Sequence, residues 1–159
     1  MYQVLVKRIL AERQFSSTQG WQVTVHLDPM EVCRGGVHPE GKIEVAQICL
    51  DWFRENNVRA EIDGDFGKAD FVARHPTQGT FVIEVEGTSS RIISQAFYSA
   101  LGQTLVRKNR DLPQAKYGLA FPDTTRWRTF LNSLPPRLFR NVDLKVFLVS
   151  DSGVDTFIG

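Results

Sequence analysis

The sequence contains few of the residues on which a disulfide scaffold or a zinc site depends. Its 159 residues include two cysteines and three histidines. Cys33 and Cys49 provide neither a disulfide framework nor a spaced metal knuckle, and the histidines share no spacing with a cysteine or a carboxylate. These scarcities exclude a small disulfide-rich protein and a zinc finger, and we expect a chain that works in the reducing cytoplasm.

Long apolar runs are also missing from the sequence. No stretch resembles a membrane span, and residues 1–10 alternate with charge instead of forming the apolar core of a signal peptide. We therefore expect no membrane partner. The Gly35-Gly36 pair lacks the lysine and helix that follow a phosphate-binding loop, which argues against a nucleotide-binding protein of that kind.

A strong excess of charge of one sign is absent, but the charge is unevenly distributed. The chain carries 19 basic and 18 acidic residues, a net charge of +1. Residues 87–140 hold nine lysines or arginines against two aspartates, so this segment carries +7 and the rest of the chain −6. A basic segment beside an acidic one suits a polyanion held over a cation site; a set of solvated helix faces is the alternative.

Length and composition favour a single domain with an α/β fold. An apolar fraction of 42% and a charged fraction of 23% over 159 residues are ordinary for a soluble globular protein with a real core. We divide it into an N-terminal β extension of strands and a loop, residues 1–41, and a core, residues 42–150. No internal repeat or low-complexity tract interrupts it.

The apolar periodicity predicts helix, three strands, helix, strand, helix and strand in the core. The strands within residues 116–121 and 142–150 are nearly all apolar, as expected for a mixed sheet covered by helices on both faces. The predicted helices cover residues 43–57, 89–109 and 124–134, and the predicted strands cover residues 1–10, 21–27, 58–63, 69–74, 80–86, 116–121, 142–150 and 153–158.

Three carboxylates lie in two neighbouring predicted strands. Asp70 belongs to the first strand, and Glu84 and Glu86 close the second. Because side chains alternate across a strand, both glutamates share a face with Val82, whereas the opposite face is apolar. Acidic residues that close an apolar strand are costly to bury unless a cation lies between them. These residues therefore predict a metal site; an exposed sheet edge is the alternative.

The helix predicted to follow carries a continuous polar ridge opposite its apolar face. Residues four apart lie on one face of a helix, and this spacing joins Arg91, Gln95, Ser99, Gln103 and Arg107. The candidates for nucleic-acid binding on this helix are Arg91, Gln95, Arg107 and Lys108. Guanidinium groups fit phosphate oxygens especially well, so we expect Arg107 to contact the backbone of a nucleic acid.

An acidic strand end beside a basic helix suggests a divalent cation that activates water against a phosphodiester. Hard cations such as Mg²⁺ bind carboxylates and keep several waters. The metal polarises the phosphoryl oxygen and lowers the pKa of a bound water. A third group, commonly a lysine, then orients or deprotonates the nucleophile.

The same residues resemble a known family pattern. Asp70, followed fourteen positions later by Glu84-Val85-Glu86-Gly87 and then by a helix with the sequence ALGQ, resembles the PD-(D/E)xK nuclease superfamily. The resemblance implies a restriction-endonuclease-like αβββαβ core. It implies that Asp70 and Glu84 bind Mg²⁺ or Mn²⁺ with the Val85 carbonyl as a further ligand, and that Gln103 reaches the active site.

The sequence departs from the family pattern at two positions. Glu86 replaces the lysine of the second half-motif, which leaves the general base open; Lys68, on the same strand face as Asp70, could supply the missing cation. Arg107 replaces a tyrosine found in some branches. Glu44, near the start of the first core helix, could add a metal ligand, although helix N-termini favour acidic residues in any case.

The leading interpretation is a Mg²⁺- or Mn²⁺-dependent nuclease that acts on DNA. Asp70 and Glu84 would hold the metal, and Glu86 would position water or a second ion. The alternative is a catalytically inactive module of the same fold that binds nucleic acid or a protein. A homodimer stays open in either case.

Overall fold

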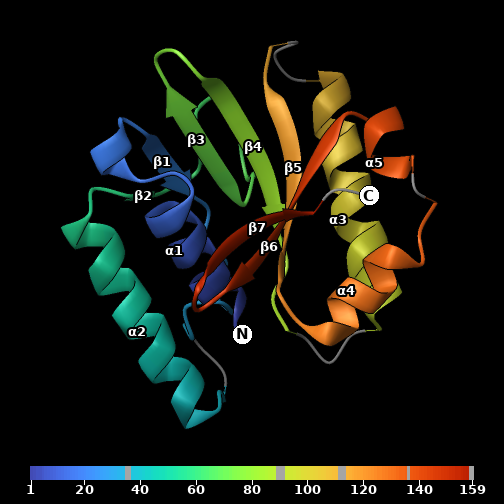
Figure 1. The fold of residues 1–159 in the computed structure, drawn as a ribbon. Helices are drawn as coiled ribbons and strands as arrows, with labels where there is room; N and C mark the ends of the chain where they lie inside the picture. Colours follow the sequence, from blue (N-terminus) through green and yellow to red (C-terminus); the bar gives the residue numbers. More distant parts are fainter. Residues whose placement is uncertain (35–36, 89–91, 111–113, 136, 158–159) are drawn as a thin grey trace.

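The chain folds around one seven-stranded mixed sheet with helices on both faces (Figure 1). The computed structural model describes residues 1–34, 37–88, 92–110, 114–135 and 137–157. The helices are α1 Gln3–Arg13, the 3-10 helix η1 Ser17–Gln19, α2 Glu40–Glu55, α3 Ile93–Arg110, α4 Thr125–Asn132 and α5 Leu138–Asn141. The strands are β1 Gln22–Val25, β2 Arg59–Ala60, β3 Phe71–His75, β4 Gly79–Val85, β5 Lys116–Pro122, β6 Leu144–Ser150 and β7 Gly153–Phe157.

The strand order β2-β1-β3-β4-β5-β6-β7 confirms the predicted α/β class with a mixed sheet. β3 and β4 form an antiparallel hairpin, and β1 pairs antiparallel with β3. β4, β5 and β6 are parallel, with α3 and then α4 and α5 as the crossover connections that parallel strands need. β7 returns antiparallel beside β6.

Alternation along the central strands divides the apolar core between the two faces of the sheet. Phe81, Ile83 and Val85 of β4 pack with α1 and α2 in one cluster. On β5 and β6, alternating residues pack instead with α3, α4 and α5 in a second cluster, which includes Phe97 and Trp127. A helix layer therefore covers each face, with α1 and α2 on one side and α3, α4 and α5 on the other (Figure 1).

The prediction of a strand over residues 1–10 is wrong, because Gln3–Arg13 forms the helix α1. Its buried residues are Val4, Val6, Lys7, Ile9, Leu10 and Ala11, so nearly every side of the helix faces the core. A helix buried on most of its circumference shows no clear helical stripe. The alternation of Val4 and Val6 therefore resembles that of a strand, although the residues are helical. Among the described residues of the N-terminal extension, β1 alone joins the sheet, between β2 and β3.

The strand predicted for residues 58–63 is reduced to Arg59–Ala60, because a polar turn follows it. The Asp63 carboxylate, 6% exposed, accepts hydrogen bonds from the backbone amides of Asp65 and Phe66 at 3.0 and 3.1 Å. The Arg74 guanidinium of β3 forks onto both oxygens of Asp63 at 2.6 and 2.8 Å. The turn is thus fastened to the sheet by one buried carboxylate.

Replacing Asp63 with asparagine is expected to lower the free energy of unfolding by about 2 kcal/mol at neutral pH. The hydrogen bonds from Arg74 lower the pKa of Asp63 from 3.8 to about 2 in the folded chain. A lowered folded pKa stabilises the fold above the ordinary carboxyl pKa, and this contribution disappears as the pH falls toward 2. Urea titrations at several pH values check the difference. Asp65→Asn, at a 61% exposed partner of the same arginine, should change stability little.

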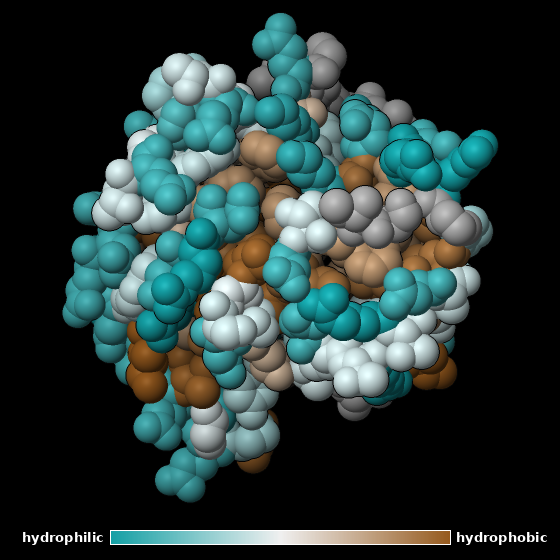
Figure 2. Space-filling view, viewed as in Figure 1, coloured by the Kyte–Doolittle hydropathy of each residue, from teal (hydrophilic) through white to brown (hydrophobic). Residues whose placement is uncertain are grey.

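Hydrophobic side chains are also exposed on the α2 side of the molecule. Figure 2 shows a largely hydrophilic periphery, a hydrophobic hollow between the layers, and a hydrophobic group over α2. The large exposed hydrophobic residues of α2 are Ile43 and Ile48. Within the described ranges, no helix is long and apolar enough to cross a membrane.

Candidate functional site

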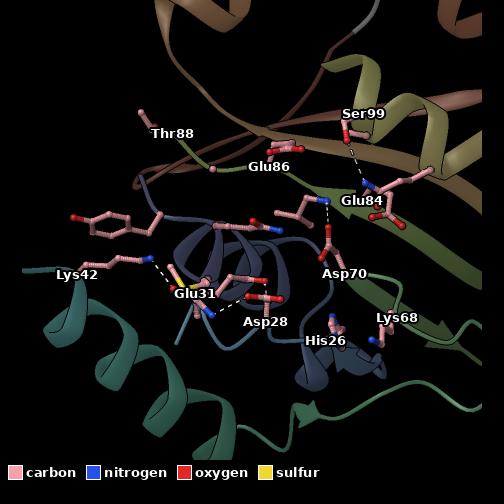
Figure 3. Close-up of a pocket in the computed structure, with 18 residues that line it drawn as sticks. His26, Asp28, Glu31, Lys42, Lys68, Asp70, Glu84, Glu86, Thr88 and Ser99 are labelled. Carbon is pink, nitrogen blue, oxygen red and sulfur yellow. Dashed lines mark hydrogen bonds between the residues drawn. The ribbon is translucent and has the colours of Figure 1, made fainter. Parts of the chain in front are cut away.

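A cavity of about 500 Å³ opens at the C-terminal end of β4, and the predicted carboxylates line it (Figure 3). Its walls come from the start of α1, the loop after β1, the first turn of α2, the residues around Asp70, the end of β4 and α3. The polar or charged lining residues include His26, Asp28, Glu31, Lys42, Lys68, Asp70, Glu84, Glu86, Thr88, Ser99 and Gln103.

Asp70 and Glu84 lie side by side because β3 and β4 are antiparallel, so the start of β3 is beside the end of β4. Phe71 is opposite Ile83, so Asp70, just before β3, lies beside the end of β4. Asp70 Oδ2 accepts a hydrogen bond from the Val85 backbone amide at 3.0 Å. Glu84 is 3% exposed and belongs to the face opposite Ile83 and Val85, toward α3. The predicted alternation of β4 is therefore confirmed up to Val85.

Lys7 of α1 binds Asp70 of this carboxylate pair, and sequence reasoning missed it. Its side chain is 0% exposed, and Nζ donates to Asp70 Oδ1 at 3.1 Å. The same ammonium donates to Glu31 Oε1 and Oε2 at 2.8 and 2.9 Å and to the His26 carbonyl at 2.7 Å. Lys7 lies three residues after Val4 and three before Leu10, so it is a lysine in an apolar helix stripe. The apolar residues three positions before and after Lys7 indicate its burial only if residues 3–13 are known to be helical.

Glu31 is the second buried acid that Lys7 holds, and it also escaped the sequence analysis. Burial raises the pKa of Glu31, while the Lys7 ammonium opposes that rise. The glutamate lies in the loop after β1, where its Oε1 also accepts from the Asp28 amide at 3.2 Å. Lys7 thus ties this loop and Asp70 to α1. A single loop glutamate carries no sequence pattern that would have identified it.

Arg107 reaches the pair from the opposite side of the sheet. Its Nε donates to Glu84 Oε1 at 2.6 Å, and its Nη1 donates to the Phe66 carbonyl at 2.9 Å. The predicted phosphate contact therefore competes with a carboxylate inside the protein. Its Nη2 forms no hydrogen bond within the part of the chain that the structure describes. Lys7 from α1 and Arg107 from α3 enclose Asp70 and Glu84 between them.

The surroundings of Glu84 make it costly for Glu84 and Asp70 to be ionised together. Burial and, after it, the nearby Asp70 charge together raise the pKa of Glu84 to about 7, although Arg107 opposes the rise. Two carboxylates this close cannot both ionise cheaply in a desolvated site. The pair thus provides a position where additional positive charge would be stabilised.

The third predicted acid does not complete a metal cluster. Glu86, one residue past the end of β4, lines the same cavity, but Figure 3 shows its carboxylate apart from those of Asp70 and Glu84. In the described ranges, no group of three or more His, Cys, Asp or Glu is arranged to hold a metal ion. The three predicted acids therefore line one cavity, and of the three it is Asp70 and Glu84 that lie beside each other.

The remaining predicted site residues occupy different places. Gln103 and Lys68 both line the cavity, and the Gln103 amide donates to Ser99 Oγ at 3.3 Å. Glu44 is exposed on α2 and is not among the lining residues. Gln95 is exposed near the start of α3. The Lys108 ammonium binds Asp143 Oδ2 at 3.0 Å and the Val142 carbonyl at 3.0 Å, at the other end of the helix.

Arg91, together with Ser89 and Ser90 at the start of the predicted helix, lies outside the described residues. The glycine that precedes them has a clear steric role. A Cβ at Gly87 would lie 2.6 Å from the Gln3 backbone nitrogen and 3.1 Å from Gln3 Cα. Thr88 then exchanges hydrogen bonds with Met1, its amide donating to the Met1 carbonyl at 2.7 Å. This close approach brings the start of α1 to the rim of the cavity.

These features define an α/β protein with a mixed sheet and a carboxylate pair beside the C-terminal end of its inner strand β4. Two solved structures share the fold over essentially the whole chain. An XisH family protein from Nostoc punctiforme has a TM-score of 0.53 and 18% identity, with 100% of both chains covered. An fdxN element excision controlling factor protein from Anabaena variabilis has a TM-score of 0.53 and 20% identity, with 99% of this chain and 98% of that one covered.

At these identities the likeness shows the fold alone. No protein-family model matches the sequence, and no curated protein matches it significantly. The chemistry must therefore be argued from the site itself.

Proposed function

We propose that this protein is a Mg²⁺- or Mn²⁺-dependent nuclease that hydrolyses phosphodiester bonds in DNA. The observation that carries the proposal is the pair of half-buried Asp70 and buried Glu84 between two cations, Lys7 and Arg107, in the lining of an open cavity. The sequence resemblance to the PD-(D/E)xK superfamily assigns the metal to the same two residues. One of the similar structures is named as an fdxN element excision controlling factor, which agrees with DNA as the substrate.

The donor set fits Mg²⁺ better than a softer metal. Each oxygen of Asp70 accepts one described hydrogen bond, from Lys7 and from the Val85 amide, and a carboxylate oxygen has two lone pairs. Glu84 gives one oxygen to Arg107. Both acids therefore keep acceptor capacity. Mg²⁺ commonly uses one or two carboxylates and completes its shell with waters and substrate phosphates, so two acids suffice.

The charge of the buried groups also supports this ligand. Asp70, Glu84 and Glu31, when ionised, carry three negative charges against the two positive charges of Lys7 and Arg107. That state has a net charge of −1 in a partly desolvated cluster, which favours protonation of Glu84 unless a cation is bound. A divalent cation together with one phosphodiester would bring the total to zero, whereas a second free anion would raise the cost of burial.

The residues of the chain have separable roles in this proposal. When bound, the divalent ion supplies polarisation of the phosphoryl oxygen and a water of lowered pKa. Lys7 orients Asp70 through their ion pair, as a positioning residue. Arg107 does the same for Glu84, and Glu86 and Gln103 line the cavity where they can orient water or a substrate oxygen. Lys42 and Lys68 line it as cations for the phosphate backbone.

A second candidate is an inactive member of the same fold that binds nucleic acid or a protein. The observation in its favour is that each carboxylate already has a cationic partner, and that Glu86 replaces the family lysine. Lys7 could then be a purely structural substitute for the metal charge.

Incubation with DNA separates the two functions. Supercoiled plasmid, linear duplex and single-stranded DNA are each incubated with purified protein in Mg²⁺, in Mn²⁺ and in excess chelator. We expect cleavage with either metal and none with chelator. Binding of DNA without cleavage under every metal condition would support the inactive module, and cleavage that persists in chelator would contradict a metal-dependent mechanism.

A further inference from the structure

A groove lies beside the carboxylate cavity, between α3 and the turn after Asp63. It encloses about 700 Å³. One wall is the turn at Phe66 and Gly67, and the other is α3, through Tyr98, Gly102 and Val106. Volumes of this order accommodate small organic ligands.

The α3 wall of this groove is unusually apolar for an exposed surface. Tyr98 is 60% exposed and Val106 is 50% exposed. They lie eight residues apart with Gly102 midway, so all three share one helix face. A Cβ built on Gly102 meets no atom within 4 Å, so the helix is open there. The ring of Tyr98 and the side chain of Val106 are therefore exposed to solvent, with the open space at Gly102 between them.

The groove adjoins the carboxylate cavity. Ser99 and Gln103 line both, so a strand that lies along α3 could contact the two together. Arg107 also lines the groove while its Nε binds Glu84. Its unengaged Nη2 leaves donors available for an anionic group. An aromatic face, amide and hydroxyl groups and a guanidinium therefore stand next to the proposed site of phosphodiester cleavage.

We propose that this groove binds an unpaired base of a nucleic-acid strand, stacked on Tyr98, next to the phosphodiester held at Asp70 and Glu84. This inference rests on the proposed function and specifies its substrate as a strand with at least one unpaired nucleotide. Every base has a π-face, so stacking on an aromatic side chain is tolerant of sequence. In an intact duplex both faces of an internal base are covered by its neighbours, and the base must be unstacked to reach such a surface.

Binding measured without catalysis tests the groove independently of hydrolysis. Fluorescence anisotropy with labelled single-stranded and duplex oligodeoxynucleotides is recorded in excess chelator. We expect the single strand to bind more tightly than the duplex, and Tyr98→Ala to weaken its binding about 5- to 100-fold. Tyr98→Phe keeps the ring and should stay within about twofold.

Gly102→Leu provides a second variant that fills the groove. Leucine is a better helix former than glycine, and the open space at Gly102 accepts its first atoms, so the fold should be kept. We expect it to weaken single-strand binding as much as Tyr98→Ala. Ile48→Ala, at a comparably exposed hydrophobic residue on α2, is the matched control and should leave binding unchanged.

Three results would overturn the assignment. The first is single-strand binding that is unaffected by Tyr98→Ala and Gly102→Leu. The second is wild-type protein that binds no single strand at all. The third is a dimer that becomes monomeric with Tyr98→Ala in light scattering, which would make the groove a contact between copies. Metal-dependent cleavage of duplex DNA could survive any of these results, so this inference and the proposed function fail separately.

Discussion

Replacing Lys7 with methionine is expected to lower the free energy of unfolding by about 3–5 kcal/mol. The ammonium is 0% exposed and satisfies Asp70, Glu31 and the His26 carbonyl at once. Methionine fills a similar volume without the charge, so two buried carboxylates lose their cation. The large effect comes from these uncompensated charges, because burying the apolar methionine side chain does not by itself destabilise the fold.

Urea unfolding of the wild type and Lys7→Met at neutral pH measures this difference. Lys68→Met, at an exposed lysine of the same cavity, should change stability by less than about 0.5 kcal/mol. Adding Glu31→Gln to Lys7→Met removes one orphaned charge and should recover part of the loss. Equal stability of Lys7→Met and Lys68→Met would show that the cluster around Lys7 is not a stabilising ion network.

Asp70→Asn is expected to reduce metal-dependent DNA cleavage about 100- to 1,000-fold. The substitution keeps the shape and the hydrogen bond from the Val85 amide but removes the charge that attracts the cation. A bound metal contributes several kcal/mol of transition-state stabilisation, and a tenfold change in rate corresponds to about 1.4 kcal/mol. Glu84→Gln should have an effect of the same order, because both acids are assigned to one ion.

Initial rates of plasmid nicking at saturating and limiting Mn²⁺ check this prediction. Glu44→Gln is the matched control, since that glutamate is exposed on α2 and does not line the cavity. If Mn²⁺ titration restores Asp70→Asn to the wild-type rate, the residue contributes only to affinity. Unaltered cleavage in both Asp70→Asn and Glu84→Gln at all metal concentrations would refute their assignment as ligands.

The sheet and the carboxylate pair were predictable because they depend on local patterns. Alternation along residues 80–85 places Glu84 opposite Ile83, and a short turn to the preceding strand makes the two strands antiparallel neighbours. Asp70 then lies beside the end of β4 as a consequence of strand register. The same reasoning brings Glu86 to the same cavity, but β4 ends at Val85, so alternation no longer determines how near its carboxylate lies to the other two.

The cations of the site were not predictable in the same way. Lys7 contacts Asp70 across 63 residues, and Glu31 belongs to a loop without periodicity. Misreading α1 as a strand also hid the lysine, since burial on most of the helix removed the usual amphipathic signal. Arg107 was expected to face a phosphate, but its position one turn from Gln103 also allows it to reach Glu84. Side-chain reach of this kind depends on tertiary packing.

The central claim is that Asp70 and Glu84 together bind one divalent cation. Anomalous diffraction from a crystal soaked in Mn²⁺ tests it most directly, because the signal locates the ion and identifies its ligands. We expect a single strong peak within coordination distance of both carboxylates, absent from crystals of Glu84→Gln. A peak bound by other residues, or no peak at the pair while Lys7 and Arg107 keep their ion pairs, would contradict the claim.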